Sequence, residues 1–187
     1  MQPEQVFSSY PVRGVSERIR ARYCPRCGRP LKEQHCPACG FTDYKNPLPG
    51  VVVLIEEQGR VLLGRRGPHS FEPGRWCLPG GFIEYAEDFL TAAIREVREE
   101  TGLRVEIRSL LSVVSNFLAE ELHTLVVVLL GRVAGGEPQA GDDLEELRWF
   151  PLEGPLPPMA FQADRHIIER YRLTRLPGAP VDPRYSG

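Results

Sequence analysis

The sequence has little lysine, no long apolar run and no secretion-type leader at its N-terminus. Only Lys32 and Lys45 are lysines among 23 basic residues, and 25 acidic residues give a formal net charge of −2. This balance gives no reason to expect non-specific binding to nucleic acid. The longest apolar runs, 51–55 and 125–130, are far shorter than the roughly 20 residues that cross a bilayer, and they predict buried strands.

The N-terminus also lacks the basic patch and apolar stretch of a signal peptide. We therefore expect a cytoplasmic protein with no membrane partner, in which cysteines serve as metal ligands more often than as disulfides. The cysteine count, 5, is odd and excludes a complete set of internal disulfides. We find no sequence repeats.

Four cysteines form two Cys-x-x-Cys-Gly turns, one with Cys24 and Cys27 and the other with Cys36 and Cys39. In each turn two thiolates point at one centre, and together they supply the four ligands of a tetrahedral zinc ion. A single Cys-x-x-Cys is also compatible with redox chemistry, but two copies so close together favour a structural zinc ribbon. The remaining Cys77 is interpreted as a small buried hydrophobe.

Prolines and glycines at 46–50 predict a boundary between this ribbon and a larger α/β domain. The predicted segments are an N-terminal segment 1–21, a zinc ribbon 22–46, the larger domain 47–176 and a flexible tail 177–187. Within the larger domain we predict strands at 51–56, 60–65, 76–78, 105–112, 122–133 and 147–150, and helices at 84–101 and 162–172.

The first of these helices carries three glutamates on one face. Glu96, Glu99 and Glu100 stand at i, i+3 and i+4, so their carboxylates converge. Their mutual repulsion would be relieved by a bound Mg²⁺ or Mn²⁺, hard cations that prefer oxygen ligands. A solvated acidic helix face is the alternative interpretation of this spacing.

The surrounding residues fit the pattern Gly-x5-Glu-x7-Arg-Glu-apolar-x-Glu-Glu-x-Gly-apolar. This pattern resembles the signature box of the Nudix hydrolases. A zinc ribbon ahead of such a domain is similar to the arrangement in NADH pyrophosphatases and in plastid FAD pyrophosphatases. The residues that fill the pattern are Gly81, Glu87, Arg95, Glu96, Val97, Glu99, Glu100, Gly102 and Leu103.

The resemblance implies an α/β/α sandwich with a mixed sheet and a box that forms a loop, a helix and a loop. It implies that Mg²⁺ or Mn²⁺ is bound by the three glutamates with help from the carbonyl of Gly81. Glu87 would pair with Arg95 and orient the carboxylates. The implied reaction is attack of water on one phosphorus of a nucleoside diphosphate derivative. The general base stays open between Glu99, which we favour, and a late carboxylate; the late candidates are Asp142, Asp143, Glu145 and Glu146.

Substrate contacts are less well defined by the sequence. Arg65 and Arg66 are candidates for binding phosphate, and a solvated strand end is the alternative. Phe161 resembles a phenylalanine of an Ala-Phe pair in FAD-cleaving relatives and is a candidate contact to the base. Trp76 either stacks on a base or packs in the core.

The substrate itself stays open between FAD, ADP-ribose and NAD(H). The segment 115–123 departs from the Ser-Gln-Pro-Trp-Pro-Phe-Pro-x-Ser segment of NADH pyrophosphatases. Between Leu103 and Pro138 there is no proline of the kind that ADP-ribose pyrophosphatases tend to have. A ligand-sensing or nucleic-acid-binding module without catalysis is the alternative function, and removal of RNA caps would need a basic groove that the sequence does not show. A homodimer is also kept open.

Overall fold

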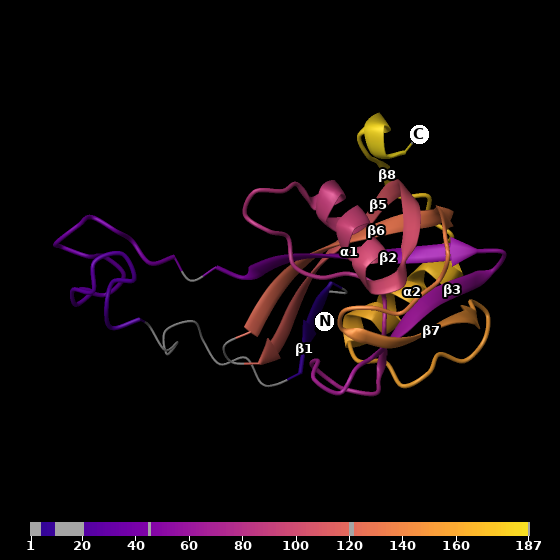
Figure 1. Cartoon of the computed structure of the whole chain (residues 1–187), viewed down its shortest axis with the longest axis horizontal. Helices are drawn as coiled ribbons and strands as arrows, with labels where there is room; N and C mark the ends of the chain where they lie inside the picture. The colour runs from indigo at the N-terminus through magenta and orange to yellow at the C-terminus, as the bar shows by residue number, and fades with distance from the viewer. Residues whose placement is uncertain (1–4, 10–20, 45, 120–121, 187) are drawn as a thin grey trace.

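The described chain combines groups of strands with two α-helices, as the sequence predicts for an α/β protein (Figure 1). The computed structural model describes residues 5–9, 21–44, 46–119 and 122–186. The elements are β1 (Val6–Ser8), β2 (Leu48–Glu57), β3 (Arg60–Arg66), β4 (Trp76–Cys77), α1 (Phe89–Thr101), β5 (Leu103–Ala119), β6 (Leu122–Gly136), β7 (Leu144–Pro151), α2 (Gln162–Thr174), β8 (Ala179–Pro180) and a short 3₁₀ helix (Pro183–Tyr185).

The described strands join into one mixed sheet. Their main order is β1-β5-β6-β2-β3-β4, with β7 beside β3 and β8 beside β5. β1 is parallel to β5 and β2 is parallel to β6, whereas the other neighbouring strands are antiparallel. The mixed sheet predicted from the sequence is therefore confirmed.

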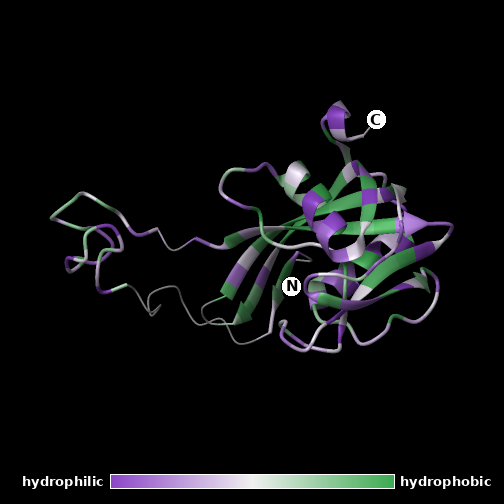
Figure 2. Cartoon of the chain, viewed as in Figure 1, coloured by the Kyte–Doolittle hydropathy of each residue, from purple (hydrophilic) through white to green (hydrophobic). Residues whose placement is uncertain are grey.

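The central strand β2 is buried on both faces because its side chains alternate between the two sides of the sheet. Val51, Val53 and Ile55 belong to the core that α1 covers, while Leu54 belongs to the core that α2 covers. Figure 2 shows the hydrophobic residues concentrated on the central strands of the sheet. A helix on each face makes the α/β/α sandwich. Neither of the two described α-helices is long and apolar enough to cross a membrane.

The helix that carries the glutamates begins later than predicted. The prediction began it at residue 84, but α1 starts at Phe89. Asp88 is its N-cap, because its backbone is extended and its carboxylate accepts two backbone N–H groups of the first turn. The residues before it form a turn in which Glu87 accepts the N–H of Glu84. Capping by Asp88 thus moves the start of the helix and leaves Glu87 in the preceding loop.

The long strands β5 and β6 extend beyond the predicted ranges 105–112 and 122–133. They pair antiparallel over most of their length, with several register shifts along the pair. Continuous pairing on this scale brings the far end of β5, around Asn116, opposite Thr124 of β6. The far ends of these strands therefore form one wall of the site described below.

The strand β1 precedes the four-cysteine segment in the chain but belongs to the main sheet. The N–H of Ser115 in β5 donates to the carbonyl of Gln5, and the ring of Phe7 packs on His166 of α2 at 5.3 Å. The four-cysteine segment is therefore inserted between two strands of one sheet. Figure 1 draws it at the left, away from the strands.

The C-terminal residues 177–186 contact the body of the domain. Ala179 and Pro180 pair antiparallel with β5, and the hydroxyl of Tyr185 donates to the carboxylate of Asp88 at 3.3 Å. These contacts differ from the flexible tail predicted from composition, because an added strand and the helix cap both bind this segment.

The glycine that ends α1 gives a test of the fold. Gly102 has a φ of 68°, and an added Cβ would lie 2.8 Å from the carbonyl oxygen of Glu137. We expect Gly102→Ala to lower the free energy of unfolding by more than the cost of about 1 kcal/mol for a left-handed non-glycine residue, as measured by urea denaturation.

Gly59→Ala is the matched control for this variant. Gly59 has a φ of 74°, but an added Cβ would meet nothing within 4 Å, so this change carries the conformational cost alone. An equal or smaller loss of stability in Gly102→Ala than in Gly59→Ala would contradict the account of this helix end.

Candidate functional site

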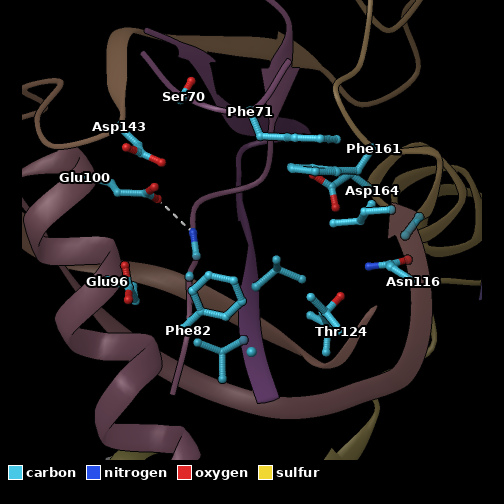
Figure 3. Close-up of a pocket in the computed structure, with 18 of the residues that line it drawn as sticks. Ser70, Phe71, Phe82, Glu96, Glu100, Asn116, Thr124, Asp143, Phe161 and Asp164 are labelled. Carbon is cyan, nitrogen blue, oxygen red and sulfur yellow. Dashed lines mark hydrogen bonds between the residues drawn. The ribbon is translucent and has the colours of Figure 1, made fainter. Parts of the chain in front are cut away.

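A cavity of about 510 Å³ lies beside α1, between the box loop, the ends of β5 and β6 and the start of α2 (Figure 3). Figure 3 shows Glu96, Glu100 and Asp143 on one side of this cavity and Asn116 and Thr124 on the other. The first group is called the acidic end and the second the neutral end. One cavity therefore offers two chemically different surfaces.

Glu100 is the more deeply buried carboxylate of the acidic end. The residue is only 3% exposed, and its Oε2 accepts the N–H of Gly80 at 2.8 Å. Burial raises the pKa of Glu100 to about 8, and burial also raises the pKa of Glu96. Such carboxylates are costly to ionise without a nearby cation. A divalent metal ion bound here would offset that cost.

Arg95 binds the remaining carboxylates together. Its guanidinium contacts Glu87 at 2.5 Å, Glu96 at 2.8 Å and Glu99 at 3.0 Å. Hydrogen bonding from Arg95 lowers the pKa of Glu87. Half of the side chain of Glu99 is exposed, and Glu99 is not part of the cavity lining. Two of the three predicted metal-binding glutamates, Glu96 and Glu100, therefore line the cavity, as Arg95 does, whereas Glu99 does not.

The loop beside these carboxylates is shaped by two glycines. A Cβ on Gly81 would lie 2.6 Å from the carboxylate of Glu96, so the missing side chain leaves room there. The carbonyl of Gly81, however, accepts the N–H of Val51, and that of Pro79 accepts the N–H of Val53. The carbonyl of Gly80 accepts no hydrogen bond from the described residues. The donor set fits a hard cation, with Gly80 better placed than Gly81 to add a carbonyl.

The two arginines predicted to bind phosphate lie in different places. Arg65 pairs with Glu145 at 2.9 Å and Glu146 at 2.8 Å and is not part of the cavity lining. Arg66 lines the cavity, is 8% exposed and contacts Asp143 at 3.1 Å. Of the late carboxylates, Asp142 and Asp143 line the cavity, whereas Glu145 and Glu146 hold Arg65.

Aromatic residues form one wall of the cavity. Phe161 lies next to Phe71 with ring centroids 5.9 Å apart and an angle of 4° between the rings. The guanidinium of Arg66 lies 5.5 Å from the Phe161 ring and donates to the carbonyl of Phe71. Trp76 is buried against Phe150, as expected for core packing. The structure thus places Phe161, and not Trp76, where a base could lie.

Sequence reasoning did not single out three polar residues that line the same cavity. Asn116 and Thr124 are direct neighbours across β5 and β6, and Asp164 on α2 is buried and accepts the N–H of Leu78 at 2.9 Å. The sequence carries no clear signal for Asn116 and Thr124, because other polar residues, such as Ser112 in β5 and His123 in β6, lie in the same strands. Pairing of the strands is what brings Asn116 and Thr124 together.

Comparison with known proteins adds family information to this geometry. Residues 46–171 match the model of the NUDIX domain. The chain belongs to the Nudix family. It is 39% identical over 129 residues to the ADP-ribose pyrophosphatase of Methanocaldococcus jannaschii, which covers 68% of this chain and 75% of that protein.

Other relatives match more of the chain than the Nudix domain alone. The chain is 36% identical over 174 residues to the NAD-capped RNA hydrolase NudC of Pseudomonas aeruginosa, covering 87% of this chain and 60% of that protein. It thus spans about 60% of the length of this relative. Among solved structures, a Nudix hydrolase from Nitrosomonas europaea matches with a TM-score of 0.67 and 26% identity, over 86% of this chain and 96% of that chain.

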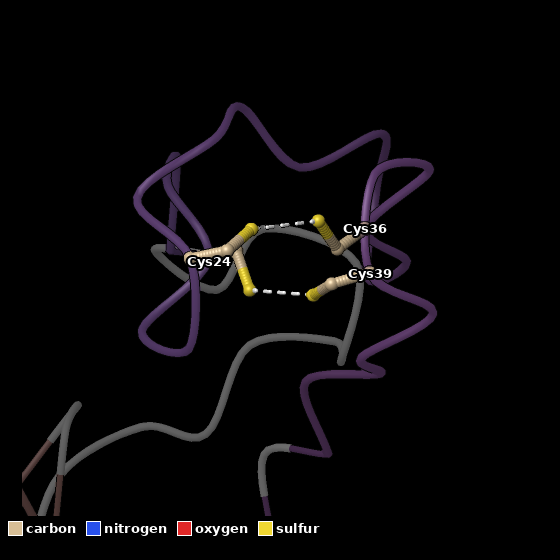
Figure 4. A group of neighbouring side chains, drawn as sticks. Cys24, Cys36 and Cys39 are labelled. Carbon is tan, nitrogen blue, oxygen red and sulfur yellow. Dashed lines mark hydrogen bonds between the residues drawn. The ribbon is translucent and has the colours of Figure 1, made fainter.

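The four cysteines that precede the Nudix domain gather at one point (Figure 4). The Sγ atoms of Cys24, Cys27, Cys36 and Cys39 all lie within 4.8 Å of one another. Burial acts to raise the pKa of Cys36, but backbone N–H groups outweigh it and lower that pKa to about 7. Among the described residues, these four cysteines form the group whose ligand atoms lie close enough together to hold one metal ion. Cys77 is buried, as predicted, and burial raises the pKa of its thiol.

Asp164 of the Nudix domain gives a test through pH. Burial raises its pKa from 3.8 to about 7, so the unfolded chain releases this proton at lower pH than the folded protein does. Ionisation of Asp164 therefore disfavours the folded state increasingly as pH rises from about 4 to about 7. We expect Asp164→Asn to gain stability relative to the parent chain as pH rises over this range, with no further gain above it.

The measurement is the free energy of unfolding by urea for both chains between about pH 5 and about pH 8. Asp43→Asn, in the four-cysteine segment, serves as the control for a changed carboxylate outside the cavity. A stability difference between parent and Asp164→Asn that is constant with pH would show that Asp164 does not titrate in this way.

Proposed function

We propose that this Nudix protein is a metal-dependent hydrolase that cleaves the diphosphate linkage of a dinucleotide or ADP-sugar, with NAD(H), ADP-ribose and FAD as the candidate substrates. The observation that carries the proposal is the single cavity with carboxylates at one end and an aromatic and polar surface at the other. A diphosphate joined to a planar base requires both surfaces at once. The names of the two relatives, one acting on ADP-ribose and the other on NAD-capped RNA, support this substrate class.

Mg²⁺ or Mn²⁺ would be held by Glu96 and Glu100, by Glu99 once it leaves Arg95, and by the carbonyl of Gly80. Such an ion supplies charge neutralisation at the phosphate oxygens and lowers the pKa of water. Arg95 keeps Glu96 oriented between Glu87 and the cavity, as outer groups do for metal ligands. Arg66 keeps Asp143 at the mouth of the acidic end.

Three groups remain as candidates for the general base. Glu99 needs to turn from Arg95 to reach the cavity, whereas Asp142 and Asp143 already line it. We favour Glu99 because it is one of the box glutamates. A loss of turnover in Glu99→Gln with activity retained in Asp142→Asn and Asp143→Asn supports this assignment. A loss in one aspartate variant with activity retained in Glu99→Gln assigns the base to that aspartate.

The metal-binding role of the glutamates is tested by Glu100→Gln and Glu99→Gln. Each change removes a negative charge while keeping the shape of the side chain. We expect kcat for ADP-ribose or NAD with Mg²⁺ to fall by about 100-fold or more, the scale on which loss of one charge-stabilising group slows an enzyme. Circular dichroism checks that the fold is retained.

Glu169→Gln on α2 is the matched control, because the side chain of Glu169 is 43% exposed, pairs with Arg165 and is not part of the cavity lining. Unchanged turnover in both Glu99→Gln and Glu100→Gln would contradict the mechanism. It would favour the alternative of a ligand-sensing or nucleic-acid-binding module without catalysis.

A second candidate substrate is RNA that carries an NAD cap. The name of the NudC relatives, NAD-capped RNA hydrolase, favours it. NAD-capped RNA presents the same diphosphate as NAD. The near-neutral composition led us to expect no nucleic-acid partner, and that expectation stays a prediction, as do the cytoplasmic location and the homodimer. Competition between free NAD and a short NAD-capped RNA for one enzyme preparation separates the two substrates.

We also propose that the four cysteines bind one structural zinc ion. Their four thiolates would complete a tetrahedral site with no open position. Elemental analysis should find about one zinc per chain, and Cys24→Ser should lose it. Cys77→Ser is the control, since Cys77 is buried away from this group and should leave the zinc content unchanged. Retention of zinc in Cys24→Ser would contradict the assignment.

A further inference from the structure

The neutral end of the cavity contains a hydrogen-bonding group that the described part of the protein leaves unpaired. The hydroxyl of Thr124 is buried and has no hydrogen-bond partner among the described residues. The amide of Asn116 lies directly across the strand pair from it, in a residue that is only 8% exposed and lines the same cavity. Buried polar groups are nearly always satisfied, so an unsatisfied hydroxyl beside an amide that lines the same cavity indicates a ligand.

The same end excludes a phosphate group. Asp164 is 3% exposed and lines this part of the cavity, and Figure 3 shows its carboxylate beside the ring of Phe161. Asn116 and Thr124 carry no positive charge that could hold an anion, and the buried carboxyl of Asp164 supplies none either. The ligand group that enters here is therefore not a phosphate.

The wall beside these polar groups favours a flat ring. The side of Phe161 is apolar and its position is supported by Phe71 and by the guanidinium of Arg66. Aromatic side chains of this kind stack on heterocyclic bases. Val126 and Ile167 also line this region, so a planar, largely apolar group fits between the wall and the polar pair.

An amide next to a hydroxyl selects among flat rings. Asn offers one donor and one acceptor side by side, which match an exocyclic amino group and the adjacent ring acceptor of adenine. The primary amide of nicotinamide presents the same donor and acceptor pair. A ring that carries only carbonyl or carboxylate oxygens at this edge cannot satisfy the acceptors of Asn116 and Asp164.

We propose that Asn116 and Thr124, with Asp164 beside them, determine substrate specificity by hydrogen bonding the amino-bearing edge of a heteroaromatic ring that lies against Phe161. This inference rests on the proposed function and deepens it, since it assigns one half of the substrate to the neutral end. The diphosphate of the substrate then extends from the neutral end to the acidic end.

Three related dinucleotides test this assignment. NAD is compared with nicotinamide purine dinucleotide, in which the adenine amino group is replaced by hydrogen, and with nicotinic acid adenine dinucleotide, in which the carboxamide is a carboxylate. We expect kcat/KM to fall by about tenfold or more for the analogue whose altered group occupies the neutral end, mainly through KM. A loss with the first analogue assigns adenine to this end, and a loss with the second assigns nicotinamide.

Substitutions connect this discrimination to the named residues. Asn116→Leu and Thr124→Val keep the approximate size of each side chain and remove its hydrogen bonds. Both should lower the ratio of kcat/KM for NAD to that for the discriminated analogue toward one. Ser115→Ala, on the opposite face of β5 because strand side chains alternate, should leave the ratio as it is in the parent chain.

The outcomes separate this inference from the proposed function. Hydrolysis of all three dinucleotides with equal kcat/KM would overturn the inference while the proposed function stands. An equal loss on all three substrates in Asn116→Leu and Thr124→Val, with the ratio unchanged, would show a structural role and also overturn it. No hydrolysis of any of them, nor of ADP-ribose or FAD, would contradict the proposed function itself.

Discussion

The contacts of one guanidinium govern the acidic end of the cavity. Arg95 lies within 3.0 Å of Glu87, Glu96 and Glu99, so three carboxylates near one helix turn do not repel one another freely. Glu99 is held by this contact and is not part of the cavity lining, whereas Glu96 and Glu100 line the cavity. In the proposed function a metal ion would compete with Arg95 for Glu99. Arg95 thus connects the loop residue Glu87 with two glutamates of the helix.

The sheet joins that acidic end to the rest of the site. β2 separates the cores beneath the two helices, and the cavity lies where the box loop crosses its end beside β6. The partners β5 and β6 then place Asn116 next to Thr124. Because β1 also pairs with β5 near Asn116, residues ahead of the four-cysteine segment support the neutral end.

Much of the acidic end is predictable from local sequence, and the neutral end is not. The spacing of Glu96, Glu99 and Glu100 on one helix and the two cysteine pairs are short-range patterns, so they predict which side chains are neighbours. The start of α1 depends on capping by Asp88, which periodicity does not detect. The pairing of Asn116 with Thr124 depends on strand register across a bulged hairpin. The different positions of Arg65 and Arg66 depend on which distant carboxylates each one contacts.

The most direct test of the central claim is identification of the products formed from NAD in the presence of Mg²⁺. Cleavage of the diphosphate at the acidic end predicts AMP and nicotinamide mononucleotide in equal amounts, with no release without the divalent ion. Release of free nicotinamide or inorganic phosphate, or product formation that persists when the metal is chelated, would contradict the account.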